Sequence, residues 1–376
     1  MMTKKSKVTK KLKTALVGAV AGSAVFGAAF WALCEIPEAM GAKPKRDAMR
    51  RSPRFHEDDG KFHNTRPRRV MEKGTMRKAL WAMFFGPNNR KPAGVIPLVN
   101  DGFFMSEEGL YITWYGHAST LVEIDGARVL FDPIWSERCS PSRLVGPRRV
   151  HEPPRPLEDL PLLDAIVISH DHYDHLDLPS IRTLASTQKA PFLVPLGVAE
   201  HLRSWGIPES RIVELDWDEH VDIAGLRLTA TAAQHFSGRG FSRDGTLWAS
   251  WVLAGAKNRV FYTGDSGYFP GYAQLGAQYG PFDATLVQIG AYDVKWPDIH
   301  MTPEEGVAAH LDLGGKLMIP VHWCTFSLSL HAWTEPADRV WREAKAHGVK
   351  IAVPRPGERV DVAQPPQVAN WWHELT

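Results

Sequence analysis

The hydrophobic positions of the chain fall into short runs whose order repeats once between residues 111 and 290. Residues 111–133 alternate between apolar and polar positions as paired strands do, and residues 246–267 repeat the pattern. The β-branched run DAIVIS, from Asp164, corresponds to the run DATLVQIG, from Asp283, in the second half. Residues 303–312 and 335–347 have helical character. The pattern predicts an α/β fold of two similar halves, with two sheets face to face and helices outside.

A different pattern occupies the N-terminus, where residues 14–34 form a run of 21 residues without a charge. Such a run can span a bilayer as a helix, and the lysine-rich residues 1–13 favour a cytoplasmic N-terminus. A cleaved signal peptide is the alternative, with Ala39 and Gly41 at a candidate cleavage site, but signal cores are usually about 7–15 residues long. We therefore expect a basic cytoplasmic leader (1–13), a transmembrane anchor or uncleaved signal (14–34), a basic linker or arm (35–75) and a globular body (76–376). The body of this single-pass protein would be periplasmic or otherwise extracytoplasmic.

Apolar side chains recur at helical spacing in residues 76–85, MRKALWAMFF. Two interpretations stay open: a helix packed on the core, and an interfacial helix that helps to admit a lipid. In the second interpretation the lipid-contacting residues are Leu80, Trp81, Phe84 and Phe85.

The net charge of +2 conceals an asymmetry between the two ends of the chain. Residues 1–70 hold 16 basic and 6 acidic residues, a balance of +10, which leaves 28 basic against 36 acidic, or −8, for the remainder. A basic leader on a mildly acidic body indicates a membrane surface as partner and argues against nucleic acid. The 3 cysteines are dispersed and form no CxxC pair, so a disulfide framework is excluded.

Three histidines and three aspartates are concentrated in residues 167–177, VISHDHYDHLD, directly after a predicted buried strand. Imidazole nitrogens and carboxylates are the usual ligands of zinc and similar metals, and ligands of α/β sheets gather at the carboxyl ends of strands. The candidate ligands in this stretch are His170, His172, Asp174 and His175. Further candidates follow other predicted strands: His235 in TATAAQHFSG, Asp265 in VFYTGDSG and His322 in KLMIPVHWCTF.

The order HxHxDH, a later His, an Asp before Gly and a final His resembles the metallo-β-lactamase superfamily. The segments YGHASTLVEIDGARVLFDPIWSERCSPSRLVGPRRV, DAIVISHDHYDHLD, QHFSGRG, FYTGDSGYFP, GPFDATLVQIGAYD and VHWCTFSLSLHAWTEP more narrowly resemble the N-acyl-phosphatidylethanolamine-hydrolysing phospholipase D family. The resemblance covers about residues 60–360. It implies an αββα four-layer sandwich in which residues 76–376 form a hydrolase domain.

The resemblance also implies two zinc ions per chain. His170, His172 and His235 would hold the first, and Asp174, His175 and His322 the second, with Asp265 between them. Two adjacent cations can activate a water and bind the oxygens of a phosphodiester. Asp174 and Asp265 would then be catalytic as well as ligating, and His331 resembles a position that contacts phosphate or protonates the leaving group.

Metal-bound imidazoles usually donate their other N–H to a carboxylate or carbonyl. Asp132 and Asp177 are candidates for that outer role, although Asp132 could equally be a turn residue. His117 either lines the site or is a buried hydrogen-bonded histidine.

The resemblance implies a membrane-anchored phosphodiesterase that cleaves N-acylphosphatidylethanolamine to N-acylethanolamine and phosphatidic acid. One alternative is a hydrolase of another ester or of a lactone, such as the related ascorbate-phosphate lactonases. A second is a membrane-anchored metal-binding protein without activity, although a structural zinc needs four ligands rather than seven. The expected partners are a phospholipid substrate and the membrane, and a homodimer is compatible with the sequence.

Overall fold

A computed structural model describes residues 26–27, 30–31, 36–69, 88–100, 108–240 and 242–375. Two seven-stranded sheets form its centre. Sheet one contains, in spatial order, β16 (Arg359–Asp361), β3 (Leu110–Gly116), β4 (Ser119–Ile124), β5 (Ala127–Phe131), β6 (Ala165–Val167), β7 (Phe192–Pro195) and β8 (Ile212–Leu215). Sheet two contains β15 (Lys350–Ile351), β14 (Gly315–Val321), β13 (Phe282–Gln288), β12 (Arg259–Tyr262), β11 (Ser250–Ala254), β10 (Leu226–Thr231) and β9 (His220–Ile223).

The two sheets share one strand pattern. In sheet one, β16, β3, β4 and β5 pair antiparallel, and β5 to β8 pair parallel. In sheet two, β9 to β12 pair antiparallel, and β12 to β15 pair parallel. The predicted α/β fold of two similar halves is confirmed. The strand β16 returns from the C-terminal part of the chain to the edge of sheet one, which the sequence pattern did not reveal.

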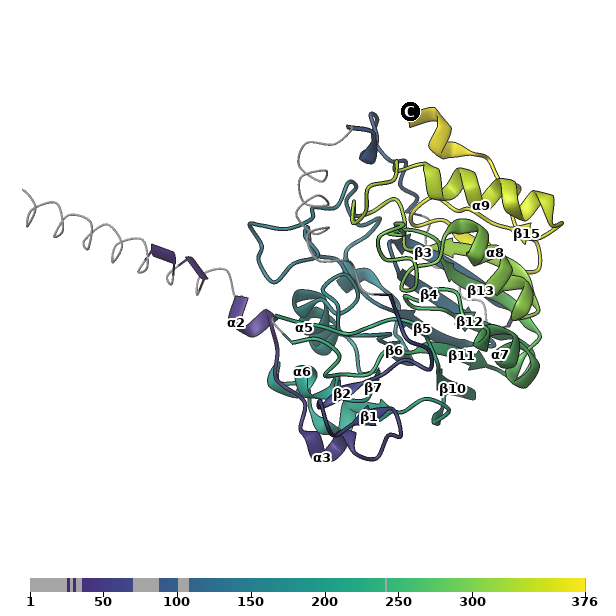
Figure 1. Cartoon of the computed structure of the whole chain (residues 1–376). Helices are drawn as coiled ribbons and strands as arrows, with labels where there is room; N and C mark the ends of the chain where they lie inside the picture. The colour runs from purple at the N-terminus through teal and green to yellow at the C-terminus, as the bar shows by residue number, and fades with distance from the viewer. Residues whose placement is uncertain are drawn as a thin grey trace, which may run out of the picture.

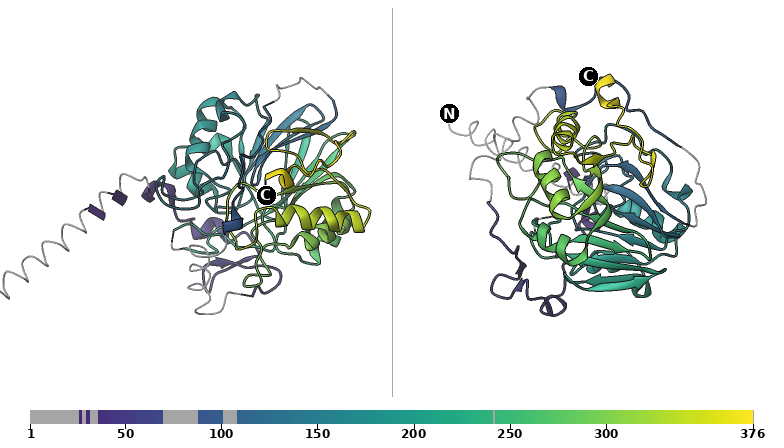
Figure 2. Two further views of the ribbon diagram at one scale, coloured as in Figure 1. Left: turned by 90° about the horizontal axis from the view of Figure 1, so that it is seen from above. Right: turned by 90° about the vertical axis from the view of Figure 1, so that its right-hand side faces the viewer.

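Helices cover the outer face of each sheet (Figure 1). The helices α5 (Leu178–Thr187) and α6 (Ala199–Ser204) lie against sheet one, while α7 (Gly271–Tyr279), α8 (Pro303–Asp312) and α9 (Glu335–Ala346) lie against sheet two. The left view in Figure 2 shows the same layers from above. This is the αββα sandwich that the resemblance implied.

Alternation along the central strands separates two apolar clusters. In β5, Val129 and Phe131 face the core between the sheets, while Leu130 faces the outer cluster under α5 and α6. The same split recurs at Val167 and Ile166 of β6. Because period-two alternation sends successive side chains to opposite faces, a strand that is apolar throughout must be covered on both sides. These buried strands therefore provide a rigid support for the loops at their ends.

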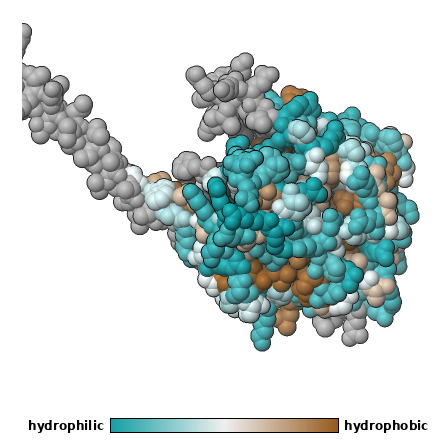
Figure 3. Space-filling view, turned by 60° about the horizontal axis from the view of Figure 1, so that its bottom comes forward, coloured by the Kyte–Doolittle hydropathy of each residue, from teal (hydrophilic) through white to brown (hydrophobic). Residues whose placement is uncertain are grey.

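Residues 36–69 form an arm on the body, with α2 (Ile36–Ala39), α3 (Arg46–Met49), β1 (Phe55–His56) and β2 (Lys61–Phe62). Its apolar side chains Met49 and Phe62 are 1% and 2% exposed and belong to the larger apolar cluster of the body. The remaining short elements are 3-10 helices at η1 (Asn88–Arg90), η2 (Leu157–Asp159), η3 (Glu209–Arg211) and η4 (Trp371–Leu375). The surface seen from below is mostly hydrophilic, with apolar patches between the polar side chains (Figure 3).

None of the helices in the described ranges is long and apolar enough to cross a membrane. Of the expected anchor at residues 14–34, only residues 26–27 and 30–31 belong to the described part of the chain. The segment 76–85, with the predicted lipid-contacting residues Leu80, Trp81, Phe84 and Phe85, lies outside it altogether.

Candidate metal centre

Acidic and imidazole side chains meet where the carboxyl ends of strands from both sheets converge. Each follows the last residue of a strand within a few positions: His117 after β3, Asp132 after β5, His170 to His175 after β6, His235 after β10, Asp265 after β12 and His322 after β14. Among the described residues the candidate ligand atoms form three clusters, each within 4.8 Å. One contains His117, Asp174, His175 and His322, and another contains His170, His172, His235 and Asp265. The third contains Asp265, His300 and His322, and so shares one residue with each of the other two. All seven predicted ligands are therefore brought together.

In the first ligand group, ring nitrogens of His170, His172 and His235 point at one another. His170 Nε2 lies 2.8 Å from His172 Nδ1, and His235 Nε2 lies 3.4 Å from the same atom. The Nδ1 atom of His235 donates to the carbonyl of Ile299 at 2.8 Å. Because that nitrogen carries the proton of the neutral ring, the lone pair of His235 Nε2 faces the group.

The second ligand group is formed by Asp174, His175 and His322. His322 Nε2 lies 3.2 Å from His175 Nε2 and 3.3 Å from Asp174 Oδ2. His175 donates its Nδ1 proton to Asp132 Oδ2 at 2.7 Å, which leaves its Nε2 lone pair turned toward the group. Two nitrogens and a carboxylate oxygen are thus placed as ligands.

Asp265 lies between the two groups. Its Oδ1 is 3.1 Å from His322 Nε2, its Oδ2 is 3.2 Å from His175 Nε2, and the same Oδ2 is 3.8 Å from His235 Nε2. The preceding Gly264 permits this approach. Its φ is +54°, and a Cβ there would come within 2.7 Å of Ser169 Cβ, so a larger residue would push the turn away from β6.

The donor set fits two metal ions of the zinc type. Two nitrogens bound tetrahedrally to one zinc ion at about 2.0–2.1 Å lie about 3.3 Å apart, which is close to the separations between these rings. Buried polar atoms also lack partners here. Among the described residues, Asp265 Oδ1, His117 Nδ1 and His300 Nδ1 are buried and make no hydrogen bond. Lone pairs and carboxylates gathered without donors are unfavourable unless a cation compensates them.

The pKa shifts of the candidate ligands also fit the binding of metal ions. Burial lowers the pKa of His170, His172 and His235, and so keeps these rings in the neutral form that binds a metal. At His175 and His322 burial opposes the charged form too, but the charges of Asp265 and Asp174 outweigh it and raise the pKa. A positive charge is therefore favoured beside these carboxylates, and a metal ion supplies it when the rings lose their protons.

Asp132 orients the ligands from behind. It is fully buried, and it accepts hydrogen bonds from Ser169 N at 2.7 Å, Ser169 Oγ at 2.6 Å, His175 Nδ1 at 2.7 Å and Tyr262 Oη at 2.5 Å. Because Ser169 gives its hydroxyl proton to Asp132, its oxygen is free to accept from His170 Nδ1 at 2.9 Å. One carboxylate thus fixes the tautomers of His170 and His175, one from each ligand group. This is the outer role considered for Asp132.

Asp177 has a different function from the one predicted. Its carboxylate accepts from Ser180 N at 3.2 Å, from the Ser180 hydroxyl and from Ser136 Oγ at 2.8 Å. It is the N-cap of α5, a position that strongly favours Asp. The carboxylate is used by the helix terminus, so the expectation that Asp177 orients a metal-bound imidazole is wrong.

His117 lines the centre rather than lying apart from it. Its Nε2 lies 2.9 Å from Asp174 Oδ2, and its ring is 4.0 Å from that of His322. Burial, followed by the neighbouring His322, lowers the pKa of His117 to about 3. Its backbone N–H donates to Thr325 Oγ1 at 2.6 Å, and its carbonyl accepts from His322 N at 2.7 Å. These bonds connect the loop after β3 to the loop after β14.

His331 does not present a free nitrogen. Its Nδ1 donates to the carbonyl of Ala332 at 2.9 Å, and its Nε2 accepts from the N–H of Ala291 at 3.1 Å. The ring stacks on Tyr292 at 4.6 Å and lines a small pocket beside His322. Since both nitrogens are engaged by the backbone, the prediction that His331 binds phosphate or acts as the acid is not supported by this geometry.

Sequence reasoning missed His300. Its Nδ1 is 3.8 Å from Asp265 Oδ2, and its ring is 5.1 Å from that of His235. Burial, only partly opposed by the charge of Asp265, lowers the pKa of His300 to about 4. His300 follows a loop rather than a strand, so its position near the centre had no periodic signal. The one local cue is the capping box of α8, Thr302 with Glu305, which begins two residues later and fixes where that loop ends.

The N-terminal arm supports the first ligand group. The side chain of Asn64 forms two hydrogen bonds with the backbone of His235, accepting from its N–H at 3.0 Å and donating to its carbonyl at 2.7 Å. Arg68 adds a bond to the same carbonyl at 3.3 Å and an ion pair with Asp244 at 2.7 Å. The backbone position of His235 therefore depends on a segment 171 residues earlier in the chain.

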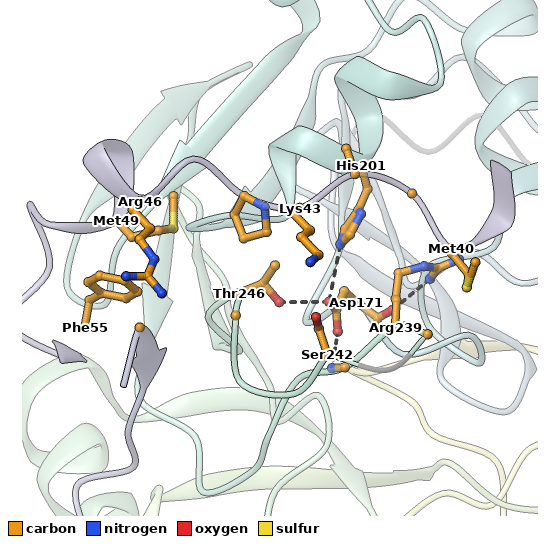
Figure 4. A pocket seen from close by; sticks show the side chains of 17 residues that line it. Met40, Lys43, Arg46, Met49, Phe55, Asp171, His201, Arg239, Ser242 and Thr246 are labelled. Carbon is orange, nitrogen blue, oxygen red and sulfur yellow. Dashed lines mark hydrogen bonds and ion pairs between the residues drawn. The ribbon is translucent and has the colours of Figure 1, made fainter. Parts of the chain in front are cut away.

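The arm also covers Asp171, which lies between the ligands His170 and His172. Asp171 accepts from Thr246 Oγ1 at 2.9 Å and from Gly238 N at 2.7 Å, and His201 Nε2 lies 3.3 Å away. These residues line a cavity of about 610 Å³ between arm and body (Figure 4). Beside it, the buried Arg239 donates to the carbonyls of Ala39 at 2.6 Å and of Asp171 at 2.7 Å, and so joins the arm to the HxHxDH loop.

Known proteins match this arrangement. A family model described as a beta-lactamase superfamily domain matches residues 127–323, which is more than half of the chain. An uncharacterized protein of Mycobacterium tuberculosis is 47% identical over 363 residues, covering 94% of this chain and 97% of its own. The N-acyl-phosphatidylethanolamine-hydrolyzing phospholipase D 1 of Caenorhabditis elegans is 35% identical over 250 residues, covering 63% of this chain and 70% of its own. A solved structure of an isothiocyanate hydrolase from Delia radicum gut bacteria has a TM-score of 0.52 at 20% identity, covers 66% of this chain and 98% of its own, and shows the same fold.

The substitution Asp265→Asn tests the bridging position. A neutral amide preserves shape but is a poor ligand between two cations, so hydrolysis should fall by about 100-fold or more, while the metal-free variant should melt at the temperature of the metal-free parent. Metal content by mass spectrometry should fall below that of the parent. Asp283→Asn is the control, because Asp283 is the second residue of β13, lies at the end of sheet two away from the candidate centre, and pairs with Lys316. An Asp265→Asn protein with parental metal content and turnover would contradict the assignment.

The substitution Asn64→Ala tests the support from the arm. Loss of both bonds to the His235 backbone should weaken metal binding by about 10- to 100-fold, the range typical of outer partners of metal ligands. Metal affinity is measured by competition with a chelator. Asn258→Ala is the matched control, since Asn258 bonds Asp125 in a turn at the other end of sheet two. Equal metal affinity in parent and Asn64→Ala would show that the arm only covers the body.

Proposed function

The chain belongs to the metallo-β-lactamase superfamily and is a metal-dependent hydrolase, and on this basis we propose that it cleaves the phosphodiester bond of N-acylphosphatidylethanolamine-type phospholipids. The products would be an N-acylethanolamine and phosphatidic acid. The observation that carries the proposal is the position of Asp265 between two ligand groups, in a chain 35% identical to a phospholipase D that acts on this substrate class.

Two zinc ions are the proposed cofactors. One ion would be held by His170, His172 and His235. The other would be held by Asp174, His175 and His322, and Asp265 would bind to both ions. When bound, such a pair lowers the pKa of a water between the ions and neutralises charge that develops on phosphodiester oxygens. Asp132 holds His170 and His175 in the tautomers that this arrangement requires.

His300 is the described residue best placed to contact the reacting phosphodiester without being needed as a ligand. Its Nδ1 makes no hydrogen bond to the described residues and faces Asp265. An imidazole in this position can donate a hydrogen bond to an oxygen of the substrate or of the leaving ethanolamide. The proposal therefore transfers to His300 the role that the sequence had suggested for His331.

The membrane part of the proposal rests on the sequence. Residues 14–34 would attach the chain to a membrane, and the body would act on lipid at its extracytoplasmic face. Leu80, Trp81, Phe84 and Phe85 would contact the acyl chains, because exposing each CH₂ of a chain to water costs about 0.8 kcal/mol.

The proposed reaction is tested with the purified full-length chain. N-acylphosphatidylethanolamine in vesicles, a short-chain phosphodiester and a lactone are offered with and without chelator, and products are identified by mass spectrometry. We expect N-acylethanolamine and phosphatidic acid, loss of turnover with chelator and recovery with zinc. In ¹⁸O-labelled water the label should enter the phosphate of phosphatidic acid, since water attacks phosphorus. Faster turnover of the lactone, or one retained metal without any turnover, would overturn the proposal.

The substitution His300→Gln tests the contact with substrate. Removing a side chain that donates to the reacting group should lower kcat by about 100-fold, at the lower end of the usual range for acid–base groups, while two metals remain bound. The readouts are kcat, KM and metal content, with His331→Gln as the control that should retain most of its kcat. Loss of one metal from His300→Gln would identify His300 as a ligand instead.

A further inference from the structure

Two large apolar side chains stand in solvent at the tip of the loop between β5 and β6. Leu144 and Val145 are each 61% exposed, and residues 143–148 are all exposed. Leu144 and Val145 are neighbours and form one contiguous apolar tip, whereas strongly exposed apolar residues such as Leu162 and Val294 are isolated in the sequence. We propose that residues 138–149, the docking loop, insert this tip into the surface of an anionic phospholipid bilayer.

The docking loop is held in a fixed shape that presents its tip. Arg138 and Arg148 form a β-bridge, and Cys139 N donates to the carbonyl of Pro147 at 3.2 Å. At the tip, the buried Ser142 Oγ accepts from Leu144 N at 3.2 Å and from Val145 N at 3.3 Å. These bonds satisfy the backbone of the turn locally, so the apolar tip can enter a bilayer interface without leaving bare N–H groups behind.

The charge of the docking loop favours an anionic bilayer as the surface that covers its tip. Residues 137–149 contain four arginines, at positions 138, 143, 148 and 149, against the single acidic Glu137, which pairs with Arg148 at 2.5 Å. The chain after residue 70 carries −8 overall, so this +3 loop is a local exception. Arg143 and Arg148 are exposed beside the apolar tip and Arg138 is half-buried, whereas Arg149 is buried at the base of the loop. Exposed arginines beside an apolar tip suit anionic headgroups above acyl chains, whereas an acidic body would be repelled by such a surface.

The docking loop also lies beside α2, the first helix after the uncharged residues 14–34. Ala39, the last residue of α2, lines a cavity of about 290 Å³ together with Arg138, Ser142 and Arg143 of the docking loop. In Figure 1, α2 lies at the left of the body beside α5, to which Glu38 is joined by an ion pair with Arg182. A segment 14–34 attached to a membrane would therefore bring this side of the body to the bilayer.

The base of the loop forms part of the wall of the metal centre. Cys139 packs with Ile134 and Phe326, and the Phe326 ring lies 5.2 Å from that of His117. Arg149 forms a β-bridge with Phe326, four residues after the ligand His322. Docking of the tip would consequently place the bilayer surface next to the centre, which is where a phospholipid substrate must enter.

The inference rests on the proposed function only for its lipid substrate, and its test has a readout that does not need turnover. The full-length chain is placed in vesicles of phosphatidylcholine alone or mixed with phosphatidylglycerol, and hydrogen–deuterium exchange is followed by mass spectrometry. Peptides spanning residues 140–148 should be protected in the mixed vesicles, while peptides around the exposed Leu162, at the opposite end of β6, should not be. Equal exchange of the tip in detergent and in both vesicles would overturn the inference.

The double substitution Leu144→Ser with Val145→Ser supplies the second readout. Turnover of N-acylphosphatidylethanolamine in mixed vesicles should fall about tenfold or more, whereas turnover of a short-chain, water-soluble phosphodiester should stay within about twofold of the parent. Leu162→Ser, which removes an equally apolar side chain that is 75% exposed, should change neither. Unchanged turnover in vesicles would refute docking by the tip. Protection of the tip that rises with protein concentration without vesicles would refute it in favour of a second copy of the chain. A parent that protects its tip but hydrolyses neither substrate would refute the proposed function and leave the docking intact.

Discussion

The constraint on which the structure depends is the electrostatic cost of placing carboxylates and bare imidazole nitrogens in one buried volume. Asp174, Asp265 and seven histidines gather around that volume, and some of their polar atoms have no hydrogen-bond partner among the described residues. Cations of suitable size relieve the cost, and the free energy of their binding then becomes part of the stability of the fold. The two sheets serve this arrangement because their buried strands fix the starting point of every ligand-bearing loop. The ligand sets come from both halves, so the sandwich and the metal centre must form together.

Much of this could be predicted because the relevant signals are local or periodic. A β-branched run followed by HxHxDH indicates a strand that ends in ligands, and Asp265 and His322 follow similar runs. Asp132 could be proposed for the same reason, since it directly follows β5, which pairs with β6 in parallel. Neighbouring parallel strands bring their carboxyl ends to one edge, so order along the chain translates directly into proximity.

The errors came from positions whose role is decided by a tertiary contact. Asp177 stands near the ligands in sequence, yet the N-terminus of α5 uses its carboxylate. His331 lies beside the centre, but the backbone of Ala291 and Ala332 uses both of its nitrogens. His300 was missed for the opposite reason, because its loop has no periodicity and only the folded chain brings it to Asp265. Composition and spacing identify which side chains are suited to a chemistry, whereas competing hydrogen bonds determine which of them remain available for it.

The N-terminal arm, residues 36–69, supports a metal centre whose candidate ligands lie far from it in the sequence. A basic segment without clear periodicity after an uncharged run predicts either a linker or an arm wrapped over the body. Here Asn64 holds the backbone of His235, and Met49 and Phe62 are buried in the larger apolar cluster of the body. The arm therefore belongs to the same cooperative unit as the metal centre. The arm is also joined to the candidate ligand loop, because Arg239 donates to the carbonyls of Ala39 in α2 and of Asp171 between His170 and His172. If residues 14–34 attach the chain to a membrane as proposed, this connection would hold the body in a fixed orientation to that membrane.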